Sequence, residues 1–474
     1  MVEATPSRRT FLQGVGLAAG AAGATGILAA GGALPAAADQ DTAAAPARGK
    51  GQRSMIGVPF ERHDEVRIGL IGLGNRGMGM LSGWTAVPGA VVTAVCDTLP
   101  DRANRAADTV QSETGRRPTI FTGGDRAYEE LCASDEVDLV YVATPWEWHF
   151  RQGMAAVKGG KHVGIELPIA TELKELWQLV DASERARRHV FLMENCSYGR
   201  NELAILRMAH DGLFGELTNG HGGYLHDLRD LLFSGYYEPD DWRRAWHATI
   251  DASFYAMHGL APIAACMDIN RGDRFTHLTA TSSAALGLAD YRERFMPADH
   301  PSWTETYVKG DRTTSMLMTE KGRMVRAEHD VSSPRPYSRI NSIAGTRGLF
   351  EDYPTRIYVE PDHSGHQWAD AQPYLDRYDH WLWRKVGDDA ANNGGHGGMD
   401  YILQWRIVQQ MRAGLVPDID VYDSAVWCSS VPLSGESIRK GGRPVAVPDF
   451  TRGRWSESRP GLDSEETDMP AVAK

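Results

Sequence analysis

The chain has 474 residues, of which 42% are hydrophobic and 24% charged, and it carries a formal net charge of −12. This length is enough for two or three domains with a large core, and the hydrophobic fraction is ordinary for a soluble globular protein. The negative charge, without a basic tract beyond isolated Arg pairs, argues against a nucleic acid as partner and does not exclude a neutral sugar as substrate.

The N-terminus carries a targeting signal rather than part of the fold. Arg8 and Arg9 form a twin-arginine pattern, a Gly/Ala-rich apolar stretch follows, and three alanines end at residue 38. These features predict a signal peptide over residues 1–38, and its low content of Leu and Ile argues against stable membrane insertion. We expect export of the folded protein to the periplasm, cell envelope or exterior, and a flexible linker over residues 39–60.

A glycine motif opens the folded part of the chain. The apolar, β-branched run Val66–Ile71 is followed by Gly72, Gly74 and Gly77 at G-x-G-x-x-G spacing. In a dinucleotide-binding turn the first glycine allows the tight turn, the second lets the backbone approach the pyrophosphate, and the third lets the next helix pack near the strand. The N-terminus of that helix then offers free N–H groups to the phosphates.

An acidic residue supports the same interpretation. The apolar run 91–95 leads to Asp97, about twenty residues past the last glycine of the motif, where a carboxylate binds the adenosine ribose hydroxyls. No Arg or Lys directly follows Asp97 to bind a 2′-phosphate, so the pattern favours NAD over NADP. The alternative is a Gly-rich turn with a solvated Asp.

Alternating strand and helix patterns predict the fold class. Residues 61–193 indicate an N-terminal Rossmann domain with a doubly wound parallel sheet. Residues 194–452 indicate a C-terminal α+β domain with a largely antiparallel open sheet, and residues 453–474 a polar, mobile tail. The expected strands are 66–71, 91–95, 139–143, 162–165, 190–193, 217–224, 275–283, 313–319, 324–329 and 338–344. The expected helices include 150–158, 173–187, 201–211, 259–267 and 399–413.

Two segments follow strands of the first sheet, beyond whose carboxyl ends a ligand is expected. In Ala-Thr-Pro-Trp-Glu-Trp-His, Trp148 and His149 are expected to wall the nicotinamide side, unless the loop is simply aromatic packing. Glu166, Leu167 and Pro168 end the next strand. Sugar oxidoreductases of the glucose–fructose oxidoreductase type carry Glu-Lys-Pro there, and Leu167 cannot move the proton that their lysine moves.

A histidine and several aromatic residues mark the expected substrate side. Tyr255 and His258 precede an apolar helical run, and a histidine at a helix start above the crevice is well placed for proton transfer. Tyr224 lies in Gly-Tyr-Leu-His-Asp-Leu-Arg, and Arg243 follows. Aromatic rings stack on sugar faces, and Arg hydrogen-bonds hydroxyl or acetamido oxygens. The alternatives are a structural histidine and a polar, aromatic domain face.

The five cysteines are scattered and show no Cys-x-x-Cys spacing. An odd number without such spacing predicts neither a disulfide framework nor a zinc site. Most of them lie in apolar runs, so we expect buried free thiols and no bound metal.

Together these motifs resemble glycoside hydrolase family 109, the NAD-dependent α-N-acetylgalactosaminidases, over residues 66–411. The segments that carry the resemblance are GLGNRGMGM, ATPWEWH, MENCSYGR, GYLHDLR, YAMHGLAP and GGHGGMD. Besides the glycines and Asp97, the resemblance implies an NAD site at Asn75, Arg76, Trp146, Glu147, Trp148, His149, Glu166, Leu167 and Asn195. It implies substrate contacts, for a glycan with terminal N-acetylhexosamine, at Tyr224, Arg243, Tyr255, Ala256, Met257, His258 and Tyr337.

The implied mechanism has no net redox change. NAD takes hydride from C3 of the sugar, the C3 ketone acidifies the proton on C2, and the group on C1 is eliminated; water then adds and the hydride returns. We expect His258 to act as an acid/base, assisted by Tyr198 or Tyr255, with Glu166 orienting substrate or cofactor. Which group deprotonates C2 stays open at this point.

Two other functions fit the same motifs. One is an exported sugar oxidoreductase with tightly bound NAD(P), against which Leu167 and the YAMHGLAP segment argue. The other is a sugar-binding protein with a vestigial nucleotide fold, against which the glycine motif, Asp97 and His258 argue. An exposed face of the C-terminal sheet would also provide a natural surface for a homo-oligomer.

Overall fold

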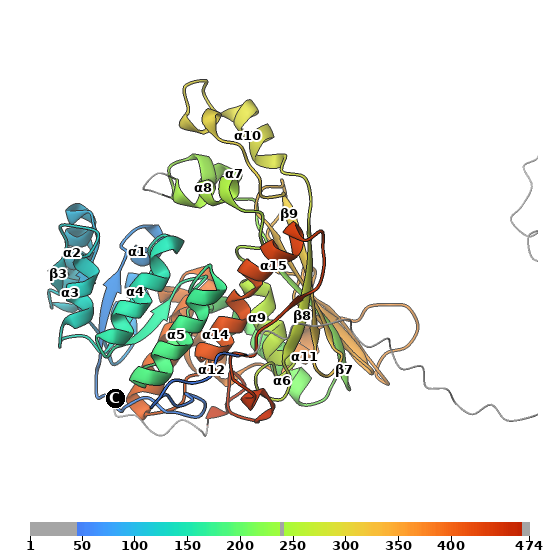
Figure 1. Ribbon diagram of the computed structural model, residues 1–474. Helices are drawn as coiled ribbons and strands as arrows, with labels where there is room; N and C mark the ends of the chain where they lie inside the picture. The colour runs from blue at the N-terminus through green and yellow to red at the C-terminus, as the bar shows by residue number, and fades with distance from the viewer. Residues whose placement is uncertain (1–44, 238–240, 467–474) are drawn as a thin grey trace, which may run out of the picture. The chain divides into compact units, whose positions relative to one another are not determined.

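The computed structural model describes residues 45–237 and 241–466, which form two sheets flanked by helices (Figure 1). The predicted signal peptide, residues 1–38, and the start of the predicted linker lie outside the described residues. Within 45–237 and 241–466, no helix has both the length and the apolar character needed to cross a membrane.

Six parallel strands form the first sheet in the order β3-β2-β1-β4-β5-β6. They are β1 (Val66–Ile71), β2 (Ala90–Cys96), β3 (Thr119–Phe121), β4 (Leu139–Val142), β5 (His162–Ile165) and β6 (Val190–Leu192). Their helices are α1 (Asn75–Ala86), α2 (Pro100–Thr114), α3 (Ala127–Ala133), α4 (Trp146–Lys158) and α5 (Leu173–Ala186). β4 and β5 are fully buried, as expected for strands covered on both faces. The strand order reverses between β1 and β4, so a ligand crevice is expected at their carboxyl ends.

Eight strands form the second sheet in the order β13-β12-β11-β7-β10-β9-β8-β14. They are β7 (Leu217–Leu225), β8 (Phe275–Ser282), β9 (Arg312–Thr319), β10 (Met324–Asp330), β11 (Ser342–Gly345), β12 (Gly348–Glu351), β13 (Arg356–Val359) and β14 (Val445–Ala446). All neighbours pair antiparallel except β7 and β10. The two sheets confirm the predicted fold class.

One strand is shorter than predicted. The alternation over 338–344 predicted a strand, but β11 begins at Ser342, and Ser338 makes only an isolated bridge with Leu225. Ile340 and Asn341 have φ values of 67° and 45°, in the left-handed region, which interrupts the extended backbone.

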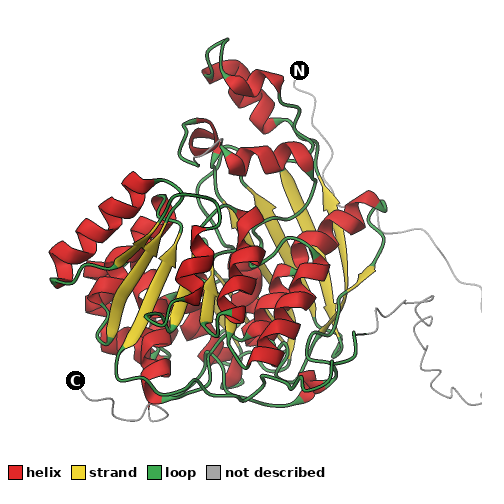
Figure 2. Cartoon of the chain, turned by 60° about the vertical axis from the view of Figure 1, so that its left-hand side comes forward, coloured by secondary structure: helices red, strands yellow, loops and turns green. Residues whose placement is uncertain are grey.

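The remaining helices join the two sheets and project beyond them. They are η1 (Asn195–Tyr198), α6 (Arg200–His210), α7 (Arg229–Phe233), α8 (Trp242–Thr249), α9 (Met257–Cys266), α10 (Gly287–Phe295), η2 (Pro301–Thr304), α11 (Gln372–Arg377), α12 (Trp381–Asn393), η3 (His396–Gly398), α13 (Met399–Ala413), α14 (Val421–Cys428), α15 (Ser430–Arg439) and η4 (Arg454–Ser456). α14 contacts both β6 and α9, so helices lie between the two groups of strands (Figure 2).

Close packing of α9 on the second sheet positions the functional site. A Cβ on Gly259 of α9 would lie 1.9 Å from the backbone nitrogen of Gly223, and one on Gly222 would lie 2.3 Å from the Gly259 carbonyl oxygen. Only glycine permits this approach of helix to strand. It brings the first turn of α9, which holds His258, beside the end of β7, which holds Tyr224.

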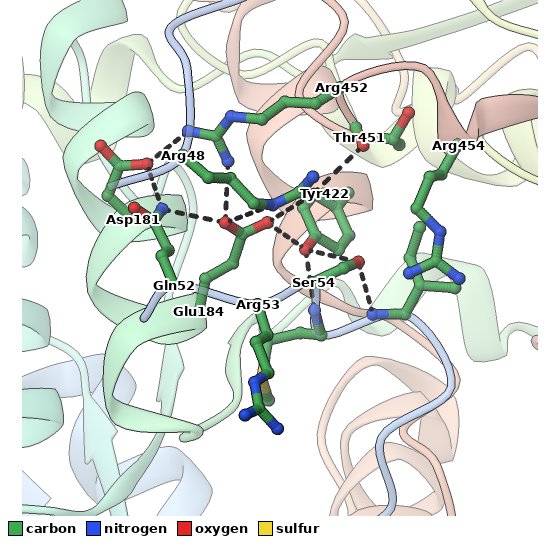
Figure 3. Close-up of polar contacts among 12 residues, drawn as sticks. Arg48, Gln52, Arg53, Ser54, Asp181, Glu184, Tyr422, Thr451, Arg452 and Arg454 are labelled. Carbon is green, nitrogen blue, oxygen red and sulfur yellow. Dashed lines mark hydrogen bonds and ion pairs between the residues drawn. The ribbon is translucent and has the colours of Figure 1, made fainter. Parts of the chain in front are cut away.

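Residues 45–60, predicted to be a flexible linker, instead pack against the folded protein. Met55 and Phe60 are buried. Arg48 and Gln52 bind the carboxylate of Glu184 on α5 (Figure 3). Composition alone predicted a linker because the partners of these side chains lie more than a hundred residues away in the chain.

Residues 453–466, predicted to begin a mobile tail, are also packed. Leu462 is buried, and Arg459 forms an ion pair with Asp420 at the start of α14. Asp463 accepts a hydrogen bond at 2.8 Å from Nδ1 of His210, whose Nε2 lies 3.3 Å from Asp268. These contacts hold the described part of the C-terminal segment against α6 and α14.

The His210 contacts predict a pH-dependent stability. Burial opposes the imidazolium, but the bonds to Asp268 and Asp463 outweigh it and raise the pKa of His210 to about 10. A raised pKa contributes stability that is full below the unfolded value, about 6.5, and is lost as the pH rises toward 10. We expect urea unfolding at pH 6 and pH 9 to show a smaller loss of stability in His210→Gln than in the wild type; an equal loss in both proteins would contradict this origin.

Candidate active site

The glycine motif forms the turn between β1 and α1. Gly72 has φ 89°, and a Cβ on Gly77 would lie 1.8 Å from the Gly72 carbonyl oxygen. Above Gly74 the turn is open, because a Cβ there would meet no atom closer than 3.7 Å. In the described structure, α1 begins at Asn75 without a capping side chain or an acidic residue in its first turn. Its first N–H groups are therefore available to a pyrophosphate.

Asp97 lies at the end of β2, next to this turn. Its carboxylate accepts hydrogen bonds from the backbone nitrogens of Leu73 (2.8 Å) and Leu99 (2.9 Å). A basic residue that local spacing did not reveal also lies here: Arg102 of α2 approaches the open space above Gly74. The tight turn, the available N–H groups and the fixed carboxylate fit an NAD(P) dinucleotide.

Substitution of a motif glycine tests this cradle directly. We expect Gly77→Ala to lose bound NAD(P), because the added methyl group would collide with the Gly72 carbonyl and displace α1 from the turn. Gly79→Ala is the matched control, since a Cβ on Gly79 in the same helix meets no atom within 4 Å. The measurement is the amount of nucleotide released from desalted, denatured protein. Equal nucleotide content in the two variants would contradict the assignment.

Arg76 connects the dinucleotide turn to the second half of the chain. Its Nε donates to Glu166 at 2.7 Å, and Nη1 and Nη2 donate to Asp400 of α13 at 2.8 and 3.1 Å. Asn195 also donates to Asp400, at 2.7 Å. Burial alone would raise the pKa of Asp400, but Arg76 and the hydrogen bond from His396 hold it below its ordinary value. The structure thus links Arg76 directly to Glu166 and, through Asp400, to Asn195. Asp400 was not among the site residues expected from the sequence.

The Trp-Glu-Trp segment is helical rather than a loop, because α4 begins at Trp146. Trp146 is buried and Glu147 is exposed. Trp148 packs edge-on against Tyr128 of α3, with ring centroids 6.4 Å apart. Residues two apart on a helix do not share a face, so Trp148 packs on α3 instead of joining Trp146.

His149 and Leu167 have structural roles beside the crevice. Nδ1 and Nε2 of His149 lie 2.7 Å from the carbonyl oxygens of Pro168 and Thr144, and burial lowers its pKa. Trp148 and His149 therefore do not form the predicted wall of the nicotinamide site. His149 instead connects the segments that follow β4 and β5. Leu167 is fully buried.

Arg243 of α8 lies in a cage of aromatic rings. Its Cζ is 4.5 Å from the ring centroid of Tyr255, 5.2 Å from Trp146 and 5.1 Å from Tyr237. Nη1 donates to the Tyr237 hydroxyl at 3.3 Å, but Nε and Nη2 are buried without a partner in residues 45–237 and 241–466. A buried, unsatisfied guanidinium is costly, so these two donors fit an oxygen of a bound ligand.

His258 is oriented by a buried carboxylate. Its Nδ1 lies 2.8 Å from Oε1 of Glu194, a residue with 0% exposure that also accepts the backbone N–H of Cys196. Since Nδ1 is engaged, Nε2 is the nitrogen left to exchange a proton with a ligand. Glu194 lies two residues past the end of β6, and Glu166 directly follows β5. That position is the signal that could have revealed it.

Glu194, Cys196 and His258 place three potential metal-ligand atoms within 4.8 Å of one another. However, burial raises the pKa of Cys196 well above its ordinary value, so the thiol stays protonated and donates to Asn195. Metal binding needs the thiolate. The chemistry of the group therefore fits a hydrogen-bonded cluster around His258. All five cysteines are free and buried, as predicted.

Tyr224 and Tyr255 flank His258, with ring centroids 5.1 and 4.9 Å from its own. Tyr337 lies 6.0 Å from Tyr224. Ala256 and Met257 are fully buried, so any ligand contact from them goes through the backbone at the start of α9.

Tyr198 is not part of this group. Its hydroxyl donates to Asp418 at 3.3 Å, and the same carboxylate binds Arg406. The residue ends η1, whose last turn directs it into the core near α13. The structure therefore gives Tyr198 a structural partner instead of a place beside His258.

Comparison with known proteins agrees with this geometry. Residues 66–194 match the model of an oxidoreductase family with an NAD-binding Rossmann fold, and residues 198–457 match the C-terminal domain of glycosyl hydrolase 109. A glycosyl hydrolase family 109 protein of Streptomyces coelicolor is 66% identical, covering 95% of this chain and 97% of its own. An alpha-N-acetylgalactosaminidase of Shewanella oneidensis is 42% identical, covering 96% and 98%.

Solved structures show the same fold at lower identity. A levoglucosan dehydrogenase in complex with NADH and L-sorbose superimposes with a TM-score of 0.60 at 18% identity, covering 82% of this chain and 100% of its own. The chain is an enzyme of glycoside hydrolase family 109, with an NAD(P)-binding Rossmann domain followed by the family's C-terminal domain.

Proposed function

We propose that this enzyme hydrolyses terminal α-N-acetylgalactosaminides by transient oxidation of the sugar, with NAD as its resident cofactor. The observation that carries the proposal is the bond between His258 and the buried Glu194, whose neighbour Asn195 is linked through Asp400 to Arg76 at the start of α1. A direct displacement would need a free pair of carboxylates across the glycosidic bond. Here Glu166 and Asp400 are both bound to Arg76.

Each neighbouring group then has a distinct task. The unpartnered donors of Arg243 bind the acetamido oxygen, and the rings of Tyr255 and Tyr224 contact the sugar faces. A bound NAD would supply the acceptor for a hydride from C3 of the sugar and the donor for its return. Nε2 of His258 takes the proton of the C3 hydroxyl, while Glu194 stabilises the resulting imidazolium.

The cofactor, export and assembly form the rest of the proposal. Asp97 favours NAD, because it would repel a 2′-phosphate. The twin-arginine signal would export the protein already folded around its cofactor, which a closed catalytic cycle need not exchange. A homo-oligomer would use the outer face of the second sheet, where alternate residues of β9, including Met316 and Met318, are only half-buried.

A panel of nitrophenyl glycosides tests the substrate assignment. Purified protein should cleave the α-N-acetylgalactosaminide without added electron acceptor and without net change in the nucleotide it carries. Failure to cleave any N-acetylhexosaminide, together with stoichiometric reduction of the nucleotide by a free sugar, would instead support the sugar oxidoreductase function.

A further inference from the structure

A second group able to move a proton lies beside His258. The hydroxyl of Tyr224 is 2.9 Å from Nδ1 of His226, two residues along the chain. We propose that Tyr224 and His226 form a proton relay, separate from His258, that removes and returns the proton on C2 of the sugar. This inference rests on the proposed function and assigns the step that it left without a residue.

The position of the pair suits exchange between the site and solvent. Tyr224 is buried at the end of β7, with its ring 5.1 Å from that of His258. His226 is only partly buried, so it can exchange protons with water. The pair therefore runs from the catalytic histidine toward the protein surface.

Tyr224 differs from the other tyrosines of the site in the hydrogen-bonding partner of its hydroxyl. Among the described residues, the Tyr255 hydroxyl has no hydrogen-bonding partner, and the Tyr337 hydroxyl accepts a bond from Arg339. Of the three tyrosine hydroxyls beside His258 in the described structure, those of Tyr224, Tyr255 and Tyr337, the one on Tyr224 is hydrogen-bonded to an imidazole. Burial raises the pKa of Tyr224, so it acts by passing a proton on rather than as a stored phenolate.

The division of work between the two histidines follows from their places in the fold. His258 is bonded to Glu194, which directly precedes Asn195 in the network around Arg76 and the dinucleotide turn. Because the hydride must leave C3 toward the dinucleotide, we assign the proton of the C3 hydroxyl to His258. Tyr224, on the second sheet, then takes the proton from the neighbouring carbon, C2.

The proton and electron balance is simple. The C2–H bond breaks, Tyr224 Oη takes that proton, and its own hydroxyl proton passes to Nδ1 of His226. The electron pair forms the C1–C2 double bond as the C1–O bond breaks, and the departing oxygen takes a proton from water. The hydroxide left behind adds to C1, and the relay returns its proton to C2. The sum is hydrolysis.

Deuterium isotope effects separate this relay from a structural role. Cleavage of substrates deuterated at C2 or at C3 is measured with the wild-type holoenzyme, His226→Ala and Tyr224→Phe. We expect both variants to lower kcat by about 10²-fold, the low end for an acid–base group. The C2 isotope effect should rise and the C3 effect should fall toward one. Added imidazole should restore part of the rate of His226→Ala.

The outcomes are distinct. Slow variants whose two isotope effects keep the wild-type ratio, or a C3 effect that rises instead, would overturn the relay. His277→Ala, on the far strand β8, controls for the loss of a histidine and should retain wild-type values. A wild-type enzyme that cleaves with neither isotope effect would contradict the proposed function itself, whatever the variants do.

Discussion

Replacing His258 by Asn is expected to lower kcat for glycoside cleavage by about 10²- to 10⁴-fold, the usual contribution of a general acid–base group. Asparagine retains a donor near Glu194 and fills most of the same space, but it cannot take a proton from the sugar. The Michaelis constant should change little, because the aromatic cage around Arg243 is untouched. Steady-state kinetics on the nitrophenyl substrate measures both quantities.

Glu194→Gln is the companion variant. The amide keeps the shape of the side chain yet cannot stabilise an imidazolium, so we expect a smaller fall in kcat than for His258→Asn. The double variant should be barely slower than His258→Asn, since Glu194 acts through the histidine. Additive losses, or a His258→Asn enzyme with near-normal kcat, would contradict the assignment.

Glu184→Ala is expected to destabilise the protein by about 3–5 kcal/mol, the cost of removing one partner from a buried ionic cluster. Glu184 has 0% exposure and accepts bonds from Arg48, Gln52, Tyr422 and Arg452 at 2.6 to 3.0 Å (Figure 3). The variant removes one of the two carboxylates that pair with the buried Arg452 side chain and leaves it only Asp181. It also releases residues 45–60, which Arg48 and Gln52 hold against α5.

Urea unfolding followed by circular dichroism measures this loss. Glu457→Ala is the matched control, because its ion pair with Arg454 is largely exposed, and such pairs contribute at most about 1 kcal/mol. Similar unfolding free energies for the two variants would show that the cluster does not stabilise the fold.

Local patterns predicted the parts of the site whose chemistry lies within one segment. The glycine turn after β1 and Asp97 after β2 depend on neighbours in the chain, and both lie where expected. Arg76, Glu166 and Asn195 were expected at the nucleotide, and the structure joins them. Asp400, which binds both Arg76 and Asn195, lies on α13 more than two hundred residues later; it ends the GGHGGMD segment, but spacing along the chain did not reveal these two contacts.

The wrong predictions have a different cause, which is the direction in which a helix points each side chain. Trp148 was expected to wall the nicotinamide side together with His149, but the helix begins at Trp146 and turns Trp148 toward α3. Tyr198 was expected to assist His258, but η1 turns it into the core, where its hydroxyl donates to Asp418. Glu194, two residues past the end of β6, stays beside His258.

The central claim is that the glycosidic bond breaks by elimination after oxidation of the sugar. Hydrolysis of the nitrophenyl α-N-acetylgalactosaminide in deuterium oxide, with the product analysed by NMR, tests it most directly. The account predicts deuterium at C2 of the released N-acetylgalactosamine, since that proton is removed and returned in each turnover. Cleavage that leaves C2 fully protonated, with no rate effect from a C2-deuterated substrate, would contradict it and indicate direct displacement at C1.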